Sequence, residues 1–204
     1  MANTDTPMGL RPIRHRNGAP YNGAVNYYSV PASYGTALFV GDPVVKTGTA
    51  NTTELSAPGA GTFPIGTLPE INKAAAGTTN RITGVVVAVC ADPGNLGIIY
   101  NPASTAAVIA VCDDPDVIFE IQSDGVSTAA MMGLNAVLVY TNAGSTVTGR
   151  SGAELSIGTA PATTVGFQLN ILRLVNRVDN EIGAFSKLEV RINTHTETNA
   201  VVGI

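Results

Sequence analysis

Short runs of apolar residues, each followed by a turn signal, recur along most of the chain. The cleanest lies at 187–193, where apolar and polar residues alternate strictly and predict a strand with one buried face. A similar alternation at 167–171 loses its phase at Leu172, which predicts a β-bulge before Leu174. Both patterns have the two-residue period of a strand and not the longer period of a helix.

The strongest apolar signal comes from the centre of the chain. The segment ITGVVVAVCADP at 82–93 is a nearly continuous β-branched run closed by an Asp-Pro turn, which is typical of a buried strand. The segment AAVIAVCDDP at 106–115 repeats this pattern, either as a structural pseudo-repeat or as a chance similarity between two valine-rich strands. VIFEIQ at 117–122 alternates again, so the order of strands resembles a meander.

Weaker patterns complete an all-β prediction. One short helix is expected at 127–132, with Ser127 or Thr128 as its N-cap and Gly133 as its end. Many short strands between frequent turns predict a barrel or sandwich of short antiparallel strands, with at most one or two short helices. Further strands are expected within 37–47, 53–56, 65–71, 136–140 and 145–148.

The first 35 residues differ from this body. Pro, Gly and Asn interrupt them too often for a helix, and no sustained alternation appears before Asn26. We therefore divide the chain into an extended N-terminal arm (1–35), a β body (36–194) and a C-terminal tail (195–204). The arm is either a loose chain end or a segment that binds another protein, and its aromatic and arginine content favours the second. The residues expected to contact a partner are Arg11, Arg14, His15, Arg16, Tyr21, Tyr27 and Tyr28.

The composition favours a subunit of an assembly. Charged residues make up only 13% of the 204 residues, which is about half the usual share in a soluble protein. A surface with so few charges is poorly soluble unless other chains cover part of it. The net charge of −4 argues against nucleic-acid binding, which requires a basic surface. No membrane partner is expected either, because no apolar run reaches the ~20 residues of a membrane helix and residues 1–10 lack the apolar core of a signal peptide.

Charge is unevenly distributed along the chain. No Lys or Arg occurs between Ile82 and Gly149, whereas acidic residues cluster from 113 to 124. Because the arm is basic, we expect the arm of one copy to pair with the acidic cluster of another in a dimer or trimer. The apolar end of the tail, 200–204, is either a frayed terminus or a strand or plug donated to a neighbour.

Candidate catalytic residues are few. Neither His15 nor His195 has flanking residues that would hold an imidazole rigidly, as catalysis and metal binding require. The segment Gly149–Ala153 resembles a nucleophile elbow, but it lacks the last glycine and the strand-to-helix context of that motif. We therefore expect neither an enzyme nor a bound cofactor.

The acidic residues Asp113, Asp114 and Asp116 form the one metal-like cluster. Clustered carboxylates are ligands that calcium accepts, but the spacing does not follow the EF-hand and the same residues suit a turn between strands. Whether they bind a cation is left open. Cys90 and Cys112 are too few for a disulfide framework or a zinc site.

Three segments of the chain resemble a known class of viral protein. The opening Met1–Ala24, above all Gly9-Leu10-Arg11-Pro12 and Asn17-Gly18-Ala19-Pro20, resembles the start of tailed-bacteriophage structural proteins that decorate or cement the capsid. The segments CDDPDVIFEIQSDG (112–125) and DNEIGAFSKLEVRIN (179–193) resemble further parts of those proteins. The resemblance therefore touches the start, the middle and the end of the chain.

This resemblance implies a capsid decoration (cement) protein of the virion, which binds the outside of the head and bridges major-capsid subunits. It also implies a largely β protein, usually a dimer or trimer, made in the cytoplasm of the host bacterium. Two alternatives stay open: another virion component, such as a major-capsid, tail or spike protein, and a carbohydrate-binding β-sandwich module. A host-surface glycan is an unsupported ligand, because tryptophan is absent and the tyrosines cluster in the arm.

Overall fold

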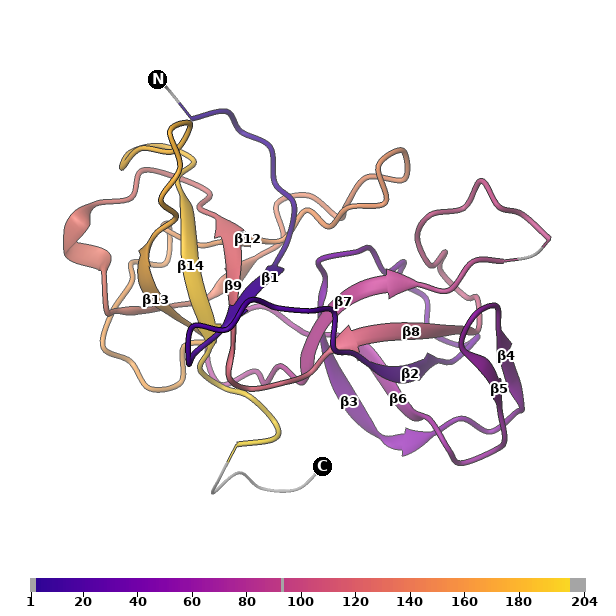
Figure 1. Ribbon diagram of the computed structural model, residues 1–204. Helices are drawn as coiled ribbons and strands as arrows, with labels where there is room; N and C mark the ends of the chain where they lie inside the picture. Colours follow the sequence, from indigo (N-terminus) through magenta and orange to yellow (C-terminus); the bar gives the residue numbers. More distant parts are fainter. Residues whose placement is uncertain (1–2, 93, 199–204) are drawn as a thin grey trace.

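The computed structural model describes residues 3–92 and 94–198, and it is all-β, as the sequence predicts (Figure 1). Two lobes lie side by side, a closed barrel and a five-stranded sheet. No helix in these described residues is long and apolar enough to cross a membrane. The strands are β1 (Arg11–His15), β2 (Asn26–Val30), β3 (Pro43–Ala50), β4 (Leu55–Ala57), β5 (Gly61–Phe63), β6 (Pro69–Lys73), β7 (Gly84–Val89), β8 (Ala107–Cys112), β9 (Val117–Gln122), β10 (Asn135–Ala136), β11 (Leu138–Val139), β12 (Glu154–Leu155), β13 (Leu169–Leu174) and β14 (Lys187–Ile192).

The barrel closes in the order β2-β6-β3-β7-β8. Its strand pairs are antiparallel except β2 with β6, which are parallel. The two similar sequence segments form β7 and β8, which are antiparallel neighbours. Their β-branched residues suit a pleated, buried surface, and Val86, Ile109 and Val111 fill the barrel with Val44 and Ile71.

The second lobe is an antiparallel sheet with the strand order β1-β9-β14-β13-β10. The alternation predicted for β14 holds, because Leu188 and Val190 are buried in the core. The register of β13 shifts between Ile171 and Arg173, which confirms the bulge predicted from the loss of phase at Leu172. The opposite face of β9 and β14 carries Glu120, Gln122, Lys187, Glu189 and Arg191 together with Ile118.

One apolar core joins the lobes. It combines Phe119 and Leu188 from the sheet with Ile82 and Val85 from the barrel side, and each of these side chains is 0% exposed. Full burial of such a side chain contributes about 1.5–3 kcal/mol. This shared core therefore holds the barrel and the sheet together as one body.

Two local predictions differ from the structure. The helix expected at 127–132 is a single 3₁₀ turn, Ala129–Met131, because Thr128 makes no side-chain cap and the backbone is already extended at Met132. The strand expected at 145–148 is a turn. Ser145 closes it by accepting hydrogen bonds from the backbone N–H groups of Thr148 and Gly149.

The described part of the N-terminal arm (1–35), residues 3–35, does not lie apart from the body, which corrects the expected boundary. β1 pairs with β9 at the edge of the sheet, and β2 closes the barrel against β8. Tyr28 and Val30 belong to the barrel core. The sequence hid β1 because a register shift between Pro12 and Arg14 breaks its alternation.

The expected start of the C-terminal tail also falls within packed structure. His195 is 0% exposed and pairs with Ile82 through a parallel β-bridge. The flanks of His195 therefore hold its imidazole firmly, contrary to the prediction from the sequence. The apolar segment 200–204, expected to be frayed or donated to a neighbour, lies outside the described residues.

Candidate partner-binding surface

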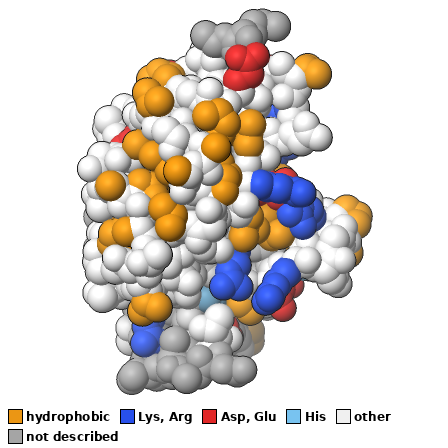
Figure 2. Space-filling view, turned by 90° about the vertical axis from the view of Figure 1, so that its left-hand side faces the viewer, with side chains coloured by type: hydrophobic (Ala, Val, Ile, Leu, Met, Phe, Trp, Pro, Cys, Tyr) orange, Lys and Arg blue, Asp and Glu red, His pale blue; other side chains and the backbone are white. Residues whose placement is uncertain are grey.

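The outer face of the five-stranded sheet gathers arginines from both ends of the chain. Strand register places Arg11 beside Glu120 and Arg14 beside Ile118. In Figure 2, most of the visible Lys and Arg side chains lie in the right-hand half of the view. We call this surface the arginine face, and its charged residues are Arg11, Arg14, Arg16, Arg173, Arg177 and Arg191 with Glu120 and Glu189.

Two buried carboxylates sit at the centre of the arginine face. Glu120 and Glu189 are direct neighbours across β9 and β14, and their exposed fractions are only 1% and 6%. Like charges in this position repel each other, so each requires a cation. Glu189 accepts bonds from Arg14 at 2.6 Å and Arg173 at 2.9 Å, and Arg177 Nη1 lies 3.0 Å from Glu120 Oε1.

These ion pairs decide the charge state of Glu189. Burial tends to raise its pKa, but the hydrogen bonds from Arg173 and Arg14 outweigh burial and hold the pKa below its ordinary value. Glu189 is therefore ionised at neutral pH and links β1, β14 and β13. Arg14, which was expected to contact a partner, instead stabilises the sheet itself.

Three other arginines of this face, Arg11, Arg16 and Arg191, are unpaired within the described residues. Within the described residues, neither the Arg16 nor the Arg191 guanidinium makes a hydrogen bond or an ion pair. Both line a pocket of about 240 Å³ whose apolar surface includes Ile118 and Leu172. An exposed guanidinium without a partner in its own chain is available to bind a carboxylate.

The three tyrosines expected to bind a partner are used inside the protein. Tyr28 is 4% exposed and donates a hydrogen bond of 2.7 Å to Asp113. Tyr27 packs against Phe63 with ring centroids 5.6 Å apart, and the Tyr21 hydroxyl donates to the Ala24 carbonyl. The structure therefore does not bring these tyrosines together with the arginines as one binding surface.

The acidic cluster is already paired with the N-terminal segment of the same chain. Asp113 accepts hydrogen bonds from Asn26 and Tyr28, and Asp114 lies 3.2 Å from His15 Nδ1. Within one copy, the contacts to Asp113 and Asp114 come from Asn26, Tyr28 and His15, and none comes from an arginine side chain of the arm. Among the residues that the structure describes, no group of three His, Cys, Asp or Glu side chains is placed to hold a metal ion.

Arg173, Arg177 and Arg191 belong to the arginine face but are not among the contact residues predicted from the sequence. Their signal was present, because Arg191 lies on the polar face of the predicted strand at 187–193. What the sequence did not reveal is that β1 lies two strands away from β14, on the other side of β9. That non-local pairing brings these arginines to the same face as Arg14 and Arg16.

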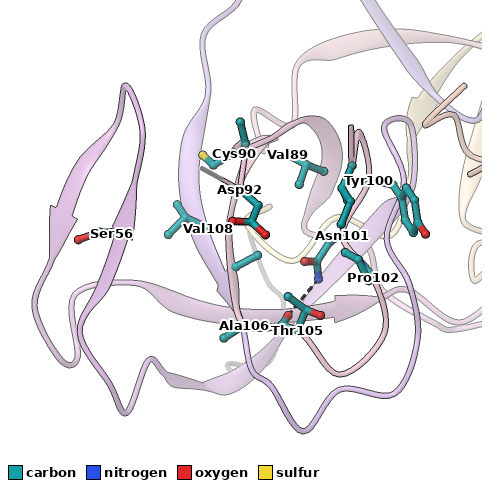
Figure 3. Close-up of a pocket in the computed structure, with 13 residues that line it drawn as sticks. Ser56, Val89, Cys90, Asp92, Tyr100, Asn101, Pro102, Thr105, Ala106 and Val108 are labelled. Atoms are coloured by element: carbon teal, nitrogen blue, oxygen red, sulfur yellow. Dashed lines mark hydrogen bonds between the residues drawn. The ribbon is translucent and has the colours of Figure 1, made fainter. Parts of the chain in front are cut away.

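A second pocket lies at one end of the barrel, between β7, β8 and the β4–β5 hairpin (Figure 3). It encloses about 340 Å³ and is lined in part by Asp92, Asn101 and Thr105. Asp92 accepts a hydrogen bond from the Gly94 N–H, and the Asn101 amide donates to the Thr105 carbonyl at 3.3 Å. These polar groups fix the loop between β7 and β8, which is a structural use for them.

Other features of this pocket do not favour sugar binding or nucleophilic chemistry. The Tyr100 ring stacks on Phe39 at a centroid distance of 5.1 Å, so one of its faces is already covered. Burial raises the pKa of the Cys90 thiol, which keeps it protonated and weakly nucleophilic at neutral pH.

The segment Gly149–Ala153 has a structural role at the junction of the lobes. The Ser151 hydroxyl donates a hydrogen bond of 2.5 Å to Asp42, and Lys73 Nζ lies 2.8 Å from the same oxygen. Lys73 also lies 4.5 Å from the centre of the Tyr140 ring. Because Ser151 is only 1% exposed, it cannot meet a substrate and instead ties its loop to the barrel.

The second histidine is equally enclosed. Burial lowers the pKa of His195, although nearby Glu197 and Asp113 and the backbone groups of Thr83 and Asp113 act in the opposite direction. Its Nδ1 accepts the Glu197 N–H, so the ring is oriented by the backbone. A neutral, buried imidazole in this setting holds the end of the described chain against the barrel.

Comparison with known proteins adds no further assignment. No family model, no curated protein and no solved structure matches this chain.

Proposed function

We propose that this protein is a capsid decoration protein of a tailed bacteriophage, which binds the outer surface of the head and bridges major-capsid subunits. The observation that supports the proposal best is the arginine face, where Arg16 and Arg191 lack partners in their own chain. The low share of charged residues and the resemblance of three sequence segments agree with it.

The mechanism we propose is electrostatic contact repeated many times. Each copy presents a rigid basic face, because the buried carboxylates and the shared core fix the strands beneath it. Complementary charge gives orientation and specificity to such a contact more than strength. Repetition over a shell, and self-association into a dimer or trimer, then supplies avidity that one contact lacks.

The test is binding of the full chain to purified heads that lack it, measured by co-sedimentation. We expect saturable binding, which the double variant Arg16→Gln/Arg191→Gln weakens at least tenfold. The matched control is Arg150→Gln, which makes the same type of charge change at an exposed residue that lies outside the pocket of Arg16 and Arg191. Equal binding by all three proteins would contradict the role of this face.

Another virion component remains the alternative function. Copy number separates the two, because a decoration protein is present in tens to hundreds of copies per particle and a tail-tip or spike protein in a few. The carbohydrate-binding alternative receives less support, since Tyr27 and Tyr100 pack against other rings and Tyr28 is buried.

A further inference from the structure

The pocket between Arg16 and Arg191 has a composition that points to one class of ligand. Arg16 follows β1, Arg191 lies on β14, and Ile118 of β9 lies between the two strands. The remaining lining residues are Pro115, Asp116, Asn170 and Leu172. Two cationic groups thus flank an apolar surface.

We propose that this pocket is a carboxylate-binding site, which takes an Asp or Glu side chain next to an apolar residue on a segment of a partner protein. The inference rests on the proposed function, because the partner we expect is the major capsid protein. A planar guanidinium binds a carboxylate through two parallel hydrogen bonds. The apolar neighbour of the acidic residue would then lie against Ile118 and Leu172.

The surrounding charges favour a carboxylate over a phosphate. Asp116 lines the same pocket, and a further negative group beside it repels a dianion more strongly than a monoanion. The net charge of −4 also opposes binding of a polyanion such as a nucleic acid. An apolar pocket surface offers nothing to a phosphate group but matches the methylene groups of a peptide.

Asn170, which also lines the pocket, offers a hydrogen-bond acceptor to a bound ligand. Asn170 directs its NH₂ group away to Asn135 Oδ1 at 2.9 Å and to the carbonyls of Gly133 and Leu134. These bonds fix the amide, so that its oxygen is the group left to accept a hydrogen bond. A backbone N–H of a bound peptide is a suitable donor for it.

The experiment is an NMR titration of the ¹⁵N-labelled full chain with the peptide acetyl-Leu-Glu-amide. The matched probes are acetyl-Leu-Gln-amide, which lacks the charge, and inorganic phosphate. We expect saturable shifts of the amides around Ile118, Asn170 and Arg191, with a dissociation constant in the millimolar range because exposed ion pairs are weak. The Gln peptide should bind at least tenfold more weakly.

Three variants sharpen the assignment. Arg191→Gln should weaken peptide binding by at least fivefold, and Asp116→Asn should tighten it two- to threefold by removing a repulsion. Arg150→Gln should leave it unchanged. Equal binding of the Glu and Gln peptides, stronger binding of phosphate, or no saturable shift up to 50 mM would overturn the proposal.

The result can be separated from the test of the proposed function. If heads bind the protein but the peptide does not, the capsid function stands and the carboxylate site is wrong. If the peptide binds and heads do not, the site stands and the proposed function is wrong. Self-association that Arg191→Gln abolishes, without peptide binding, would assign the pocket to a second copy and overturn this proposal.

Discussion

The arginine face contains two regions that use the same residue type in opposite ways. Arg14, Arg173 and Arg177 form ion pairs with the buried carboxylates of Glu120 and Glu189, so their charges link strands within the protein. Arg16 and Arg191 lie beside an apolar pocket and have no partner in the described chain. An arginine-rich segment is therefore available for binding only where its guanidinium groups have no partners inside the protein.

The largest loss of stability should come from removing the carboxylate of Glu189, which pairs with Arg14 and Arg173. Glu189→Ala removes the carboxylate that Arg14 and Arg173 share, and leaves both cations without their partner at the sheet. We expect the free energy of unfolding to fall by about 3 kcal/mol, as for other ion pairs broken on one side. Urea unfolding of both proteins measures this difference, and a loss below about 0.5 kcal/mol would show that Glu189 is not a structural link.

Glu154 is a buried carboxylate without an arginine partner, and its pKa shifts in the direction opposite to that of Glu189. Glu154 is 4% exposed, and burial together with nearby Asp5 and Asp124 raises its pKa to about 7. A raised pKa gives stability that is full below the unfolded value near 4.5 and is lost as pH rises through about 7. Glu154→Gln should therefore be more stable than the natural protein at pH 8 by about 1 kcal/mol, a value kept low because solvent screens part of the repulsion.

Thermal unfolding of the two proteins at pH 5 and pH 8 measures this effect. The advantage of the Gln variant should shrink or vanish at pH 5, where Glu154 is protonated. A variant that is less stable at both pH values would mean that Glu154 makes a favourable contact.

The paired carboxylate should show the opposite pH dependence. The pKa of Glu189 is held below its ordinary value of 4.5, so its contribution is present above that pH and is lost as pH falls through the lowered value. The natural protein and Glu189→Gln should therefore differ in stability at pH 7 and approach each other as pH falls through the lowered pKa. Denaturant unfolding at several pH values measures the trend, and a difference that stays constant would contradict it.

The smallest effect on stability should come from replacing the unpaired residues Arg16 and Arg191. Arg16→Gln/Arg191→Gln removes charges that support nothing inside the chain, so we expect the free energy of unfolding to change by less than about 0.5 kcal/mol. Urea unfolding is again the measurement. A loss comparable to that of Glu189→Ala would show that both arginines belong to the folded network and would remove the distinction between the two regions.

The sequence predicts the strands better than it predicts the surface. β7, β8, β9 and β14 follow from local alternation and β-branched runs, which depend only on neighbouring residues. The arginine face depends on pairing between β1 and β9, which lie more than a hundred residues apart. Local patterns carry no information on that pairing, so half of the arginines of this face could not be predicted from the sequence.

The N-terminal segment shows the same limit. Pro12 and the register shift beside it conceal β1 in the sequence. Tyr28 is predicted to contact a partner but is buried in the barrel, because aromatic side chains suit interfaces and cores alike. Deleting residues 1–26 would consequently remove β1 and part of β2 and disturb both lobes. Such a deletion would disrupt the fold together with any binding surface, whereas point variants of the arginine face leave the strands in place.

A reconstruction of phage heads saturated with the protein, at a resolution that shows which face meets the shell, tests the proposed function most directly. We expect the outer face of the β1-β9-β14-β13-β10 sheet to lie against the capsid, with Arg16 and Arg191 next to acidic residues of the major capsid protein. A bound protein whose arginine face points into solvent, with the barrel or its loops against the shell, would show that the arginine face does not bind the capsid.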